Sequence, residues 1–415
     1  MNSLVVAINV STLGGWGGGI DFLRMIIYSL LVSDRKKNIK VYLLFPYAYS
    51  WDVWWKKGIK HIVNKILTSK NIRIKKWHFM SKELEQVLGD FDSKICIEFY
   101  KDGEWESALK KIGADIIFPI GTSSALNIPK FPFIGYIFDF QHKYFPNFFS
   151  IRDYIAREQS FAYVLLHASA LIVHSAQVKL DIERFYPVCS CKIFDLPFAA
   201  VPIEGKKLQN IAQIVFPEIK KQYNLPDRYF VICNQFWVHK DHITAFRALA
   251  NICDKNIHIV CTGKTYDYRV PNYFKDLQKE IADVGIQERI HFLGYISKEA
   301  QLAVMYGSLA LIQPTLFDGS PGGIAGGEAV ALGVPVILSD IPVNKLVSGN
   351  NIIFFKAKCS EDLAIKMQAI LDDPIKRLPY ELLYQQSMER IKKFGDRLYD
   401  AFFVVLQNKG KAHDT

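Results

Sequence analysis

Residues 311–338, LIQPTLFDGSPGGIAGGEAVALGVPVIL, form the stretch that decides the fold. The apolar run at Ala310–Gln313, which begins one residue before this stretch, predicts a strand, and the glycine-rich segment Leu316–Gly323 predicts a turn. The residues that follow predict a helix at Gly326–Leu332 and a second strand at Pro335–Leu338. A strand, a tight turn, a helix and another strand in this order are typical of a parallel sheet covered by helices.

The same alternation extends through both halves of the chain. In the first half, strands are predicted at Val5–Val10, Lys40–Phe45, Ile95–Glu98, Ile116–Ile120, Phe133–Phe138 and Ala170–Val173, and helices at Ile20–Val32 and Arg157–Leu166. In the second half, further strands are predicted at Tyr229–Cys233, Ile257–Cys261 and Ile290–Phe292, and helices at Asp241–Ile252, Tyr273–Val284, Lys298–Tyr306, Glu361–Leu371 and from Tyr380 to about Gln407. This alternation therefore predicts an α/β protein of two Rossmann-like, doubly wound domains that face each other across a cleft.

The junction between the two halves is predicted where the chain turns polar and irregular, at Ala199–Gln222. We expect an N-terminal domain over residues 1–205 and a C-terminal domain over residues 206–385. Residues 386–415 are expected to form a helix that packs back towards the N-terminal domain.

Composition excludes several classes of protein. With 415 residues, 50% of them hydrophobic, the chain is long enough for two cores, so a disordered or fibrous protein is excluded. No apolar stretch approaches the roughly 18 residues of a membrane span, and the first ten residues resemble a buried strand, not a signal peptide. Seven cysteines, an odd number, favour a reducing compartment. We therefore expect a cytoplasmic protein.

The positive charge is concentrated in one window. Residues 34–79 contain twelve Lys and Arg against two acids, so this window carries +10, which equals the net charge of the whole chain. Tryptophans and tyrosines lie between the cations, a mixture that suits an anionic membrane surface. A solvated helix face whose aromatic residues belong to the core is the alternative. No nucleic-acid motif accompanies the charge, so we expect no nucleic-acid partner.

A second glycine-rich turn, Gly14–Gly19, follows the first predicted strand. Five glycines in six positions let the backbone approach a ligand closely, and the helix behind them offers free amides to an anion. The spacing is not that of a dinucleotide fingerprint, because Ile20 stands where the third Gly or Ala is required. The turn is therefore either a phosphate-binding loop, with Gly17, Gly18 and Gly19 as its candidates, or a flexible turn without a ligand.

The turn at Leu316–Gly323 has the same character in the second half. It lies between a strand and a helix, so the amides of Gly322 and Gly323 are candidates for binding a phosphate. Glu328 lies in the first turns of the following helix, where its carboxylate can accept sugar hydroxyl groups, and Asp318 can face the cleft.

Two further loops supply polar candidates. Lys240, after the strand at Tyr229–Cys233, would neutralise a diphosphate leaving group without a metal ion. The turn at Gly263 and Lys264 either assists it or is an ordinary turn. In the first half, Asp139 and His142 follow a strand and either contact an acceptor hydroxyl or form a structural polar pair.

Three short patterns resemble metal sites only superficially. They are the pair His239 and His242, the motif Cys189-Ser190-Cys191 and the motif Asp90-Phe91-Asp92. None has the additional ligands that a metal site requires, so we predict no metal.

Taken together, these segments resemble the retaining, nucleotide-sugar-dependent glycosyltransferases of family 4 (glycosyl transferases group 1), which have the GT-B fold. The resemblance is strongest from Asn234 to Val343, where Asn234–Leu249, residues 289–296, Leu311–Gly323, Glu328-Ala329 and residues 333–337 follow the family order. It extends more weakly to the N-terminal glycines and to Asp139–His142.

The resemblance implies a role for each matching residue. Glu328 matches the second Glu of the family's Glu-x7-Glu motif, which binds the donor ribose, and Lys240 matches the residue that stabilises the diphosphate. Tyr295 is implied to lie near the base. The full set of implied donor-binding residues is Gly17, Gly18, Gly19, Gln235, Lys240, Gly263, Lys264, Tyr295, Ser320, Gly322, Gly323 and Glu328, and the catalytic candidates are Asp318, Glu328, Lys240, His142 and Asp139.

The sequence departs from the family pattern at three places. Ser320 occupies the position of the first Glu, so either Asp318 or Ser320 replaces it. Gln235 stands where an Arg usually accompanies the Lys, and Phe138 stands where relatives often have a His, for which His142 is the candidate replacement.

As a whole, the resemblance implies a retaining, metal-independent transferase with a nucleotide sugar as co-substrate and no other cofactor. The donor would lie on the C-terminal domain, and a glycan or lipid-linked acceptor on the N-terminal one. We expect a role in bacterial surface polysaccharide synthesis, of O-antigen (lipopolysaccharide) or capsule, by a cytoplasmic protein that is peripheral on the inner face of the membrane. The alternatives are a catalytically silent GT-B protein that binds nucleotide or glycan and a sugar-nucleotide epimerase; the failed fingerprint disfavours a nicotinamide-dependent dehydrogenase.

Overall fold

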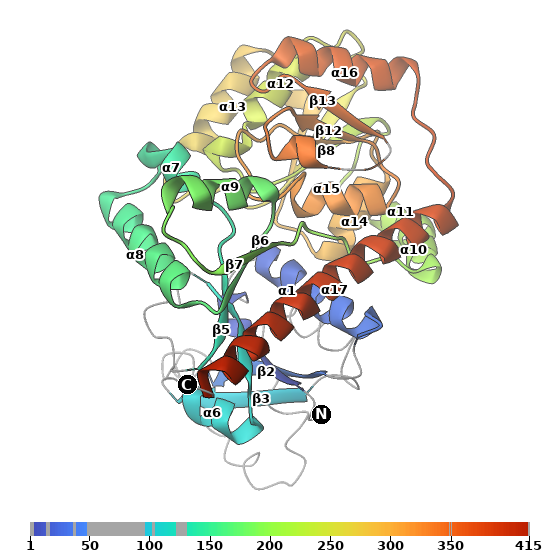
Figure 1. Ribbon diagram of the computed structural model, residues 1–415. Coiled ribbons are helices and arrows are strands. Elements are labelled where there is room, and N and C mark those ends of the chain that lie inside the picture. The colour runs from blue at the N-terminus through green and yellow to red at the C-terminus, as the bar shows by residue number, and fades with distance from the viewer. Residues whose placement is uncertain are drawn as a thin grey trace, which may run out of the picture.

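The computed structural model describes residues 4–13, 17–35, 39–47, 96–101, 104–121, 131–347, 349 and 351–413, and it contains two parallel sheets (Figure 1). The first sheet has seven strands in the order β3-β2-β1-β4-β5-β6-β7. They are β1 Leu4–Asn9, β2 Ile39–Tyr47, β3 Cys96–Lys101, β4 Ile116–Ile120, β5 Phe133–Tyr136, β6 Ala170–Val173 and β7 Lys192–Asp195.

The second sheet has six strands in the order β10-β9-β8-β11-β12-β13. They are β8 Tyr229–Cys233, β9 His258–Thr262, β10 Ile290–Gly294, β11 Leu311–Gln313, β12 Val336–Ser339 and β13 Ile352–Phe355. All strand pairs in both sheets are parallel. In each sheet the first strand of the domain lies in the middle and the chain winds outwards on both sides, which is the doubly wound order. The predicted fold class is thereby confirmed.

Helices cover both faces of each sheet. In the first domain they are α1 Gly17–Val32, α6 Trp105–Ile112, α7 Gln141–Tyr144, α8 Ile151–His167 and α9 Ala176–Phe185. The second sheet is covered by α12 His242–Ala250, α13 Tyr273–Asp283, α14 Lys298–Tyr306, α15 Gly323–Ala331 and α16 Ser360–Asp372. Each sheet therefore has a hydrophobic core on either face, because a strand buried on both sides presents apolar side chains in both directions.

The segment between the sheets differs from the prediction of an irregular junction. Residues 205–222 are helical, as α10 Gly205–Asn210, a π-helical turn Ile211–Val215 and α11 Phe216–Gln222. Ile211 is fully buried in the core on one face of the second sheet, and Val215 and Ile219 pack against the same core. This apolar spacing of four residues is helical, and Pro217 does not interrupt the structure because it lies in the first turn of α11.

The last helix, α17 Tyr380–His413, crosses from one domain to the other (Figure 1). It passes along α1, and Ile391, Phe394, Leu398 and Phe402 are buried in the core of the first sheet. The two helices approach so closely that a Cβ atom on Gly395 would lie 2.5 Å from the carbonyl oxygen of Ser29. The predicted domain boundaries at 205 and 385 stay predictions.

Among the described residues, no helix combines the length and apolarity needed to cross a bilayer. Most of the basic, aromatic window at residues 34–79 lies outside the described residues, as do Gly14, Gly15 and Trp16 of the N-terminal glycine turn.

Candidate active site

A cavity of about 180 Å³ lies between the two domains and brings together residues from both. The N-terminal domain contributes Gly18 and Asp21 from the start of α1, and the C-terminal domain contributes Gln235, Gly263, Tyr295 and Glu328. Five of these six residues are predicted donor-binding residues, and they come from loops that follow β8, β9 and β10 and from α15. We call this space the interdomain cavity. It lies beside the carboxyl ends of the strands, where doubly wound sheets bind ligands.

Glycine is required at one wall of the interdomain cavity. Gly263 has a φ of +138°, and a Cβ atom there would lie 2.1 Å from the carbonyl oxygen of Asn234. The next residue, Lys264, places its ammonium 5.4 Å from the ring centroid of Tyr295, whose side chain is half exposed. These contacts hold the loops after β8, β9 and β10 against one another.

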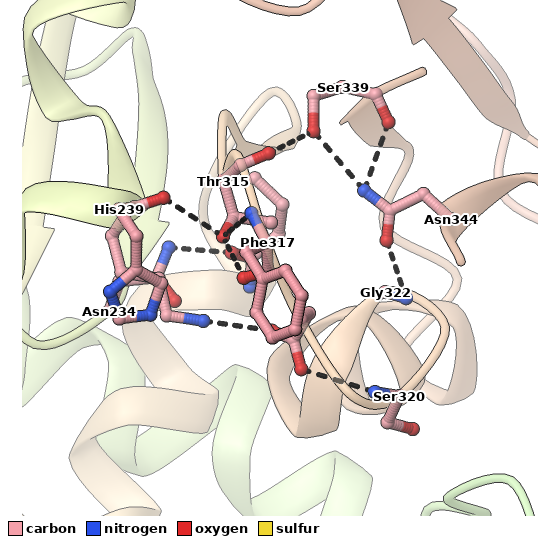
Figure 2. Close-up of polar contacts among 11 residues, drawn as sticks. Asn234, His239, Thr315, Phe317, Ser320, Gly322, Ser339 and Asn344 are labelled. Atoms are coloured by element: carbon pink, nitrogen blue, oxygen red, sulfur yellow. Dashed lines mark hydrogen bonds and ion pairs between the residues drawn. The ribbon is translucent and has the colours of Figure 1, made fainter. Parts of the chain in front are cut away.

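The glycine-rich loop of residues 314–323 is held by a buried polar network (Figure 2). The Thr315 hydroxyl donates to the carbonyl oxygens of Phe317 (2.7 Å) and His239 (3.2 Å). On the other side, the Asn344 amide nitrogen donates to the Ser339 carbonyl (2.9 Å), while its oxygen accepts from the amide of Gly322 (3.0 Å). The loop conformation is therefore fixed by side chains at both of its ends.

This network corrects one expectation about phosphate binding. The amide of Gly322 is engaged by Asn344, and the amide of Gly323 donates to the Ser320 carbonyl oxygen at 3.2 Å. Both glycines have positive φ, +65° and +62°, which curls the chain back so that these amides point into the loop. The next residues of α15, Ile324 and Ala325, line the interdomain cavity instead.

Two of the catalytic candidates form an ion pair. The ammonium of Lys240 lies 2.8 Å from Oδ2 of Asp318, and the two side chains are 15% and 22% exposed. The other oxygen of Asp318 accepts from the amide of Ser320 at 3.2 Å. Ser320 is buried, and its hydroxyl has no hydrogen-bond partner among the described residues. Asp318 therefore orients Lys240.

The loop that carries Asp318 touches the N-terminal domain. A Cβ atom on Gly319 would lie 1.8 Å from the carbonyl oxygen of Phe138 and 3.1 Å from Cβ of Asp139. The carbonyl oxygen of Gly319 also accepts from the hydroxyl of Ser175 at 2.9 Å. This contact brings the backbones of two predicted catalytic residues, Asp139 and Asp318, together from different domains.

Asp139 and His142 are placed differently from each other. Asp139 is partly exposed, accepts from the amide of Gln141 at 3.0 Å and lies 3.5 Å from the guanidinium of Arg157. His142 is fully buried, and its Nε2 lies 2.6 Å from Glu158. Burial lowers the pKa of His142. The structure favours the second of the two alternatives for His142, a structural polar pair, because the first turn of α7 directs its ring into the aromatic core, among Phe140, Tyr154 and Phe161.

Glu328 has two partners that the sequence did not indicate. Lys298 from α14 places its ammonium 3.0 and 3.1 Å from the two carboxylate oxygens of Glu328. The same ammonium lies 2.8 Å from Oδ2 of Asp21 in α1. Asp21 lies two residues after the last of the N-terminal glycines, which was a weak signal for a role in the site, whereas no motif singled out Lys298.

The N-terminal glycines lie at the start of α1. Gly17 and Gly18 open the helix, and Gly18 and Ile20 line the interdomain cavity. The helix therefore presents its amino end to the cavity, an orientation that favours an anion.

Among the described residues, no group of three His, Cys, Asp or Glu side chains converges as a metal site would require. His239 and His242 are both buried, and burial lowers the pKa of each. Cys189 and Cys191 place their sulfur atoms 3.3 Å apart. Asp90-Phe91-Asp92 lies outside the described residues.

Two parallel-sheet α/β domains with a ligand-sized cavity between them define the GT-B fold. The chain is similar over its whole length to solved glycosyltransferase structures. These include sucrose-phosphate synthase from Thermosynechococcus elongatus (TM-score 0.59, 16% identity, covering 100% of this chain and 99% of that one). Another is Anabaena HepE in complex with UDP-glucose (TM-score 0.59, 13% identity, covering 99% and 100%).

Sequence comparison is more specific for the second domain. Residues 215–383 match the family model described as glycosyl transferases group 1. The chain is also 31% identical over 179 residues to the O-antigen chain mannosyltransferase RfbU of Salmonella typhimurium. That match covers 42% of this chain and 48% of RfbU, so the chain spans about half the length of this relative.

Proposed function

We propose that the protein is a glycosyltransferase that moves a sugar from a nucleotide-sugar donor to a glycan or lipid-linked acceptor. The observation that carries this proposal is the interdomain cavity. Its lining includes four residues of the segment that matches group 1 glycosyl transferases, namely Gln235, Gly263, Tyr295 and Glu328. The similarity to an O-antigen mannosyltransferase supports a role in bacterial surface polysaccharide assembly.

The donor would bind mainly to the C-terminal domain. Glu328 would accept hydrogen bonds from the ribose hydroxyl groups, with the base near Tyr295. The diphosphate would contact the first turn of α15 at Ile324 and Ala325, since the amides of Gly322 and Gly323 are engaged inside the loop. Helix ends of this kind leave backbone N–H groups for an anion.

The reaction would retain the configuration of the sugar. In a front-face transfer the acceptor oxygen bonds to the anomeric carbon, the bond from that carbon to the diphosphate oxygen breaks, and the acceptor proton passes to the leaving diphosphate. Lys240, oriented by Asp318, would stabilise the charge that develops on the diphosphate. We propose that these fixed groups make a metal ion unnecessary.

The acceptor would approach from the N-terminal domain. Asp139 is the residue nearest this path, since it lies beside the loop of Asp318 and is partly exposed. We further propose that the protein works on the cytoplasmic face of the membrane and reaches it through the basic window at residues 34–79. A liposome pelleting assay tests this point: replacing Trp54, Trp55, Lys56 and Lys57 should abolish binding to anionic vesicles, and unchanged binding would refute it.

The function itself is tested by nucleotide binding. Calorimetry with UDP, GDP, ADP and CMP, each with and without EDTA, should show selective binding of one nucleotide that EDTA does not weaken. The nucleotide sugars of that base are then assayed for release of nucleoside diphosphate and for sugar transfer to lipid-linked acceptors.

Glu328→Gln provides the matched test of the site. It keeps the shape of the side chain but removes the charge that favours hydroxyl donors, so donor affinity should fall by at least about tenfold, as expected for hydrogen bonds to a charged group. Glu183→Gln, at an exposed position of α9, is the control and should bind as the wild type does. A wild-type protein that binds nucleotide but neither hydrolyses nor transfers any sugar would instead be a silent GT-B protein.

A further inference from the structure

One ammonium group is shared by carboxylates from both domains. Nζ of Lys298 lies 2.8 Å from Asp21 of the N-terminal domain and 3.0 Å from Glu328 of the C-terminal domain. Its third hydrogen-bond partner is the side-chain oxygen of Gln301, also at 3.0 Å. The side chains of Lys298, Asp21 and Glu328 are only 20%, 15% and 14% exposed, so water screens this triad weakly.

The surroundings of the triad contain few other charges. Arg24 lies one turn beyond Asp21, its Nη1 is 3.4 Å from Asp21, and its buried Nε has no partner among the described residues. Cys233 of β8 lines the interdomain cavity, and burial raises the pKa of its thiol to about 12, so it carries no charge. The remaining charged groups that line the adjoining cavity of about 90 Å³ are Lys207 and Glu299.

The charge state of Glu328 depends on this arrangement. The pKa of Glu328 is raised above its ordinary value: burial raises it most, Lys298 lowers it and so limits the shift, and Asp21 raises it further. Burial also lowers the pKa of Lys298, but Glu328 and Asp21 outweigh burial and leave it above its ordinary value, so the ammonium stays charged. Without Lys298, two carboxylates would face each other in a confined space, and one of them would take up a proton.

We propose that Lys298 is a positioning residue that holds Glu328 as an ionised, oriented acceptor for the sugar hydroxyls of the donor, and that Asp21 ties this arrangement to contact between the domains. The inference rests on the proposed function and deepens it. A carboxylate oxygen that accepts one hydrogen bond from Lys298 keeps a lone pair for a hydroxyl donor. The complete triad therefore forms only when α1 of the N-terminal domain lies against α14 and α15.

The pH dependence of nucleotide affinity tests the first part. In Lys298→Met, affinity at pH 7 should fall by about tenfold or more and should recover as the pH is raised to 9, because one unit of pKa shift changes the ionised fraction by up to about tenfold. Lys298→Arg keeps the charge and should stay within about threefold of the wild type. Lys275→Met, at an exposed position of α13, is the matched control.

A second-site change separates this electrostatic role from a merely structural one. Asp21→Asn removes the neighbouring negative charge, so Asp21→Asn combined with Lys298→Met should bind nucleotide at pH 7 more tightly than Lys298→Met alone. Damage to packing would not be repaired by removing another polar group. A loss in Lys298→Met that is independent of pH, or that Asp21→Asn does not relieve, would overturn the proposal.

Asp21→Asn alone tests the link between the domains. Nucleotide affinity should stay within about twofold of the wild type, while turnover falls, because the bridge to α1 is lost. Equal losses in affinity and turnover, or no loss in either, would overturn this part. If the wild-type protein binds no nucleotide, both the proposed function and the inference are refuted. If the wild type binds nucleotide and Lys298→Met binds it with the same affinity, only the inference is refuted.

Discussion

Gly319 of the C-terminal domain and Phe138 of the N-terminal domain meet so closely that a Cβ atom on Gly319 would lie 1.8 Å from the Phe138 carbonyl oxygen. The obstructing atom belongs to the backbone, so no side-chain rotation can make room for it. The contact also sets the distance between the loops of Asp139 and Asp318, which belong to different domains. A glycine at position 319 is therefore a condition for the two halves of the candidate active site to meet.

Gly319→Ala should separate donor binding from transfer. We expect nucleotide affinity within about threefold of the wild type and turnover lowered by about 100-fold, since a shift of about 1 Å in a catalytic group has that effect. Calorimetry and initial-rate kinetics measure the two quantities. Gly326→Ala is the control, because a Cβ atom there meets nothing within 4 Å; turnover like the wild type in Gly319→Ala would show that the contact is dispensable.

Asn344→Ala should weaken both the fold and the donor site. The change leaves the amide of Gly322 and the carbonyl of Ser339 without their partner, and each buried unpaired group costs about 1–3 kcal/mol. Urea unfolding should report a loss of about 2–6 kcal/mol, and calorimetry a weaker nucleotide affinity. Asn251→Ala, at an exposed position, is expected to have neither effect. If Asn344→Ala retains full stability, the loop is not held as Figure 2 shows.

Lys240→Met should impair the chemical step. Loss of a preorganised cation at the leaving group is expected to lower kcat by about 100- to 1000-fold. Asp318→Asn should have a smaller effect, because Lys240 keeps its charge and loses only its 2.8 Å ion pair. Steady-state kinetics of both variants, with Lys275→Met as the control, check this order. Comparable losses in the two single variants would indicate instead that Asp318 itself takes part in the chemistry.

His242→Phe should alter the pH dependence of stability. Burial lowers the pKa of His242 to about 3, and neither ring nitrogen has a partner among the described residues. In the unfolded chain the group titrates near pH 6.5, so below that pH the unfolded state binds one more proton and stability falls by up to about 1.4 kcal/mol per pH unit. This contribution is fully present above pH 6.5 and is lost as the pH falls towards 3.

Phenylalanine removes that proton and keeps the stacking on Phe236, whose ring centroid lies 4.3 Å away. Urea unfolding of His242→Phe between pH 7.5 and 5 should therefore show a shallower slope than the wild type, with equal or greater stability at pH 7. An unchanged slope would mean that His242 is not held neutral in the folded protein.

The sequence predicted the strands of both sheets best where apolar runs are uninterrupted. The bounds of β4, β6, β8 and α14 agree with the predictions at every residue. Two edge strands, β7 and β13, were not predicted. In β7 only two apolar residues stand between Lys192 and Asp195, whereas β13 is a run of four apolar residues that was too short to be identified by its pattern alone. The other two edge strands, β3 and β10, were predicted, but they extend two or more residues beyond the predicted ends.

The sequence predicted which loops form the candidate site, but not which side chains contact one another there. Gly18, Gly263 and Glu328, which the sequence places at or near Gly-rich turns, line one cavity in the structure, and their roles in binding a donor stay predictions. The partners of Glu328 come from other elements: Lys298 is 30 residues away along the chain, and Asp21 belongs to the other domain. No periodicity or motif encodes which side chains two separately folded sheets will bring together.

The path of α17 has a consequence for how the protein can be divided. Two separate connections link the domains, the segment before α10 and the segment that enters α17. Through the second connection, Phe394, Leu398 and Phe402 of α17 reach the core of the first sheet. An N-terminal fragment that ends before Tyr380 would expose that apolar surface to water, so it should aggregate unless a peptide of residues 380–413 is supplied. Fragment complementation, not simple truncation, is therefore the way to obtain the N-terminal domain on its own.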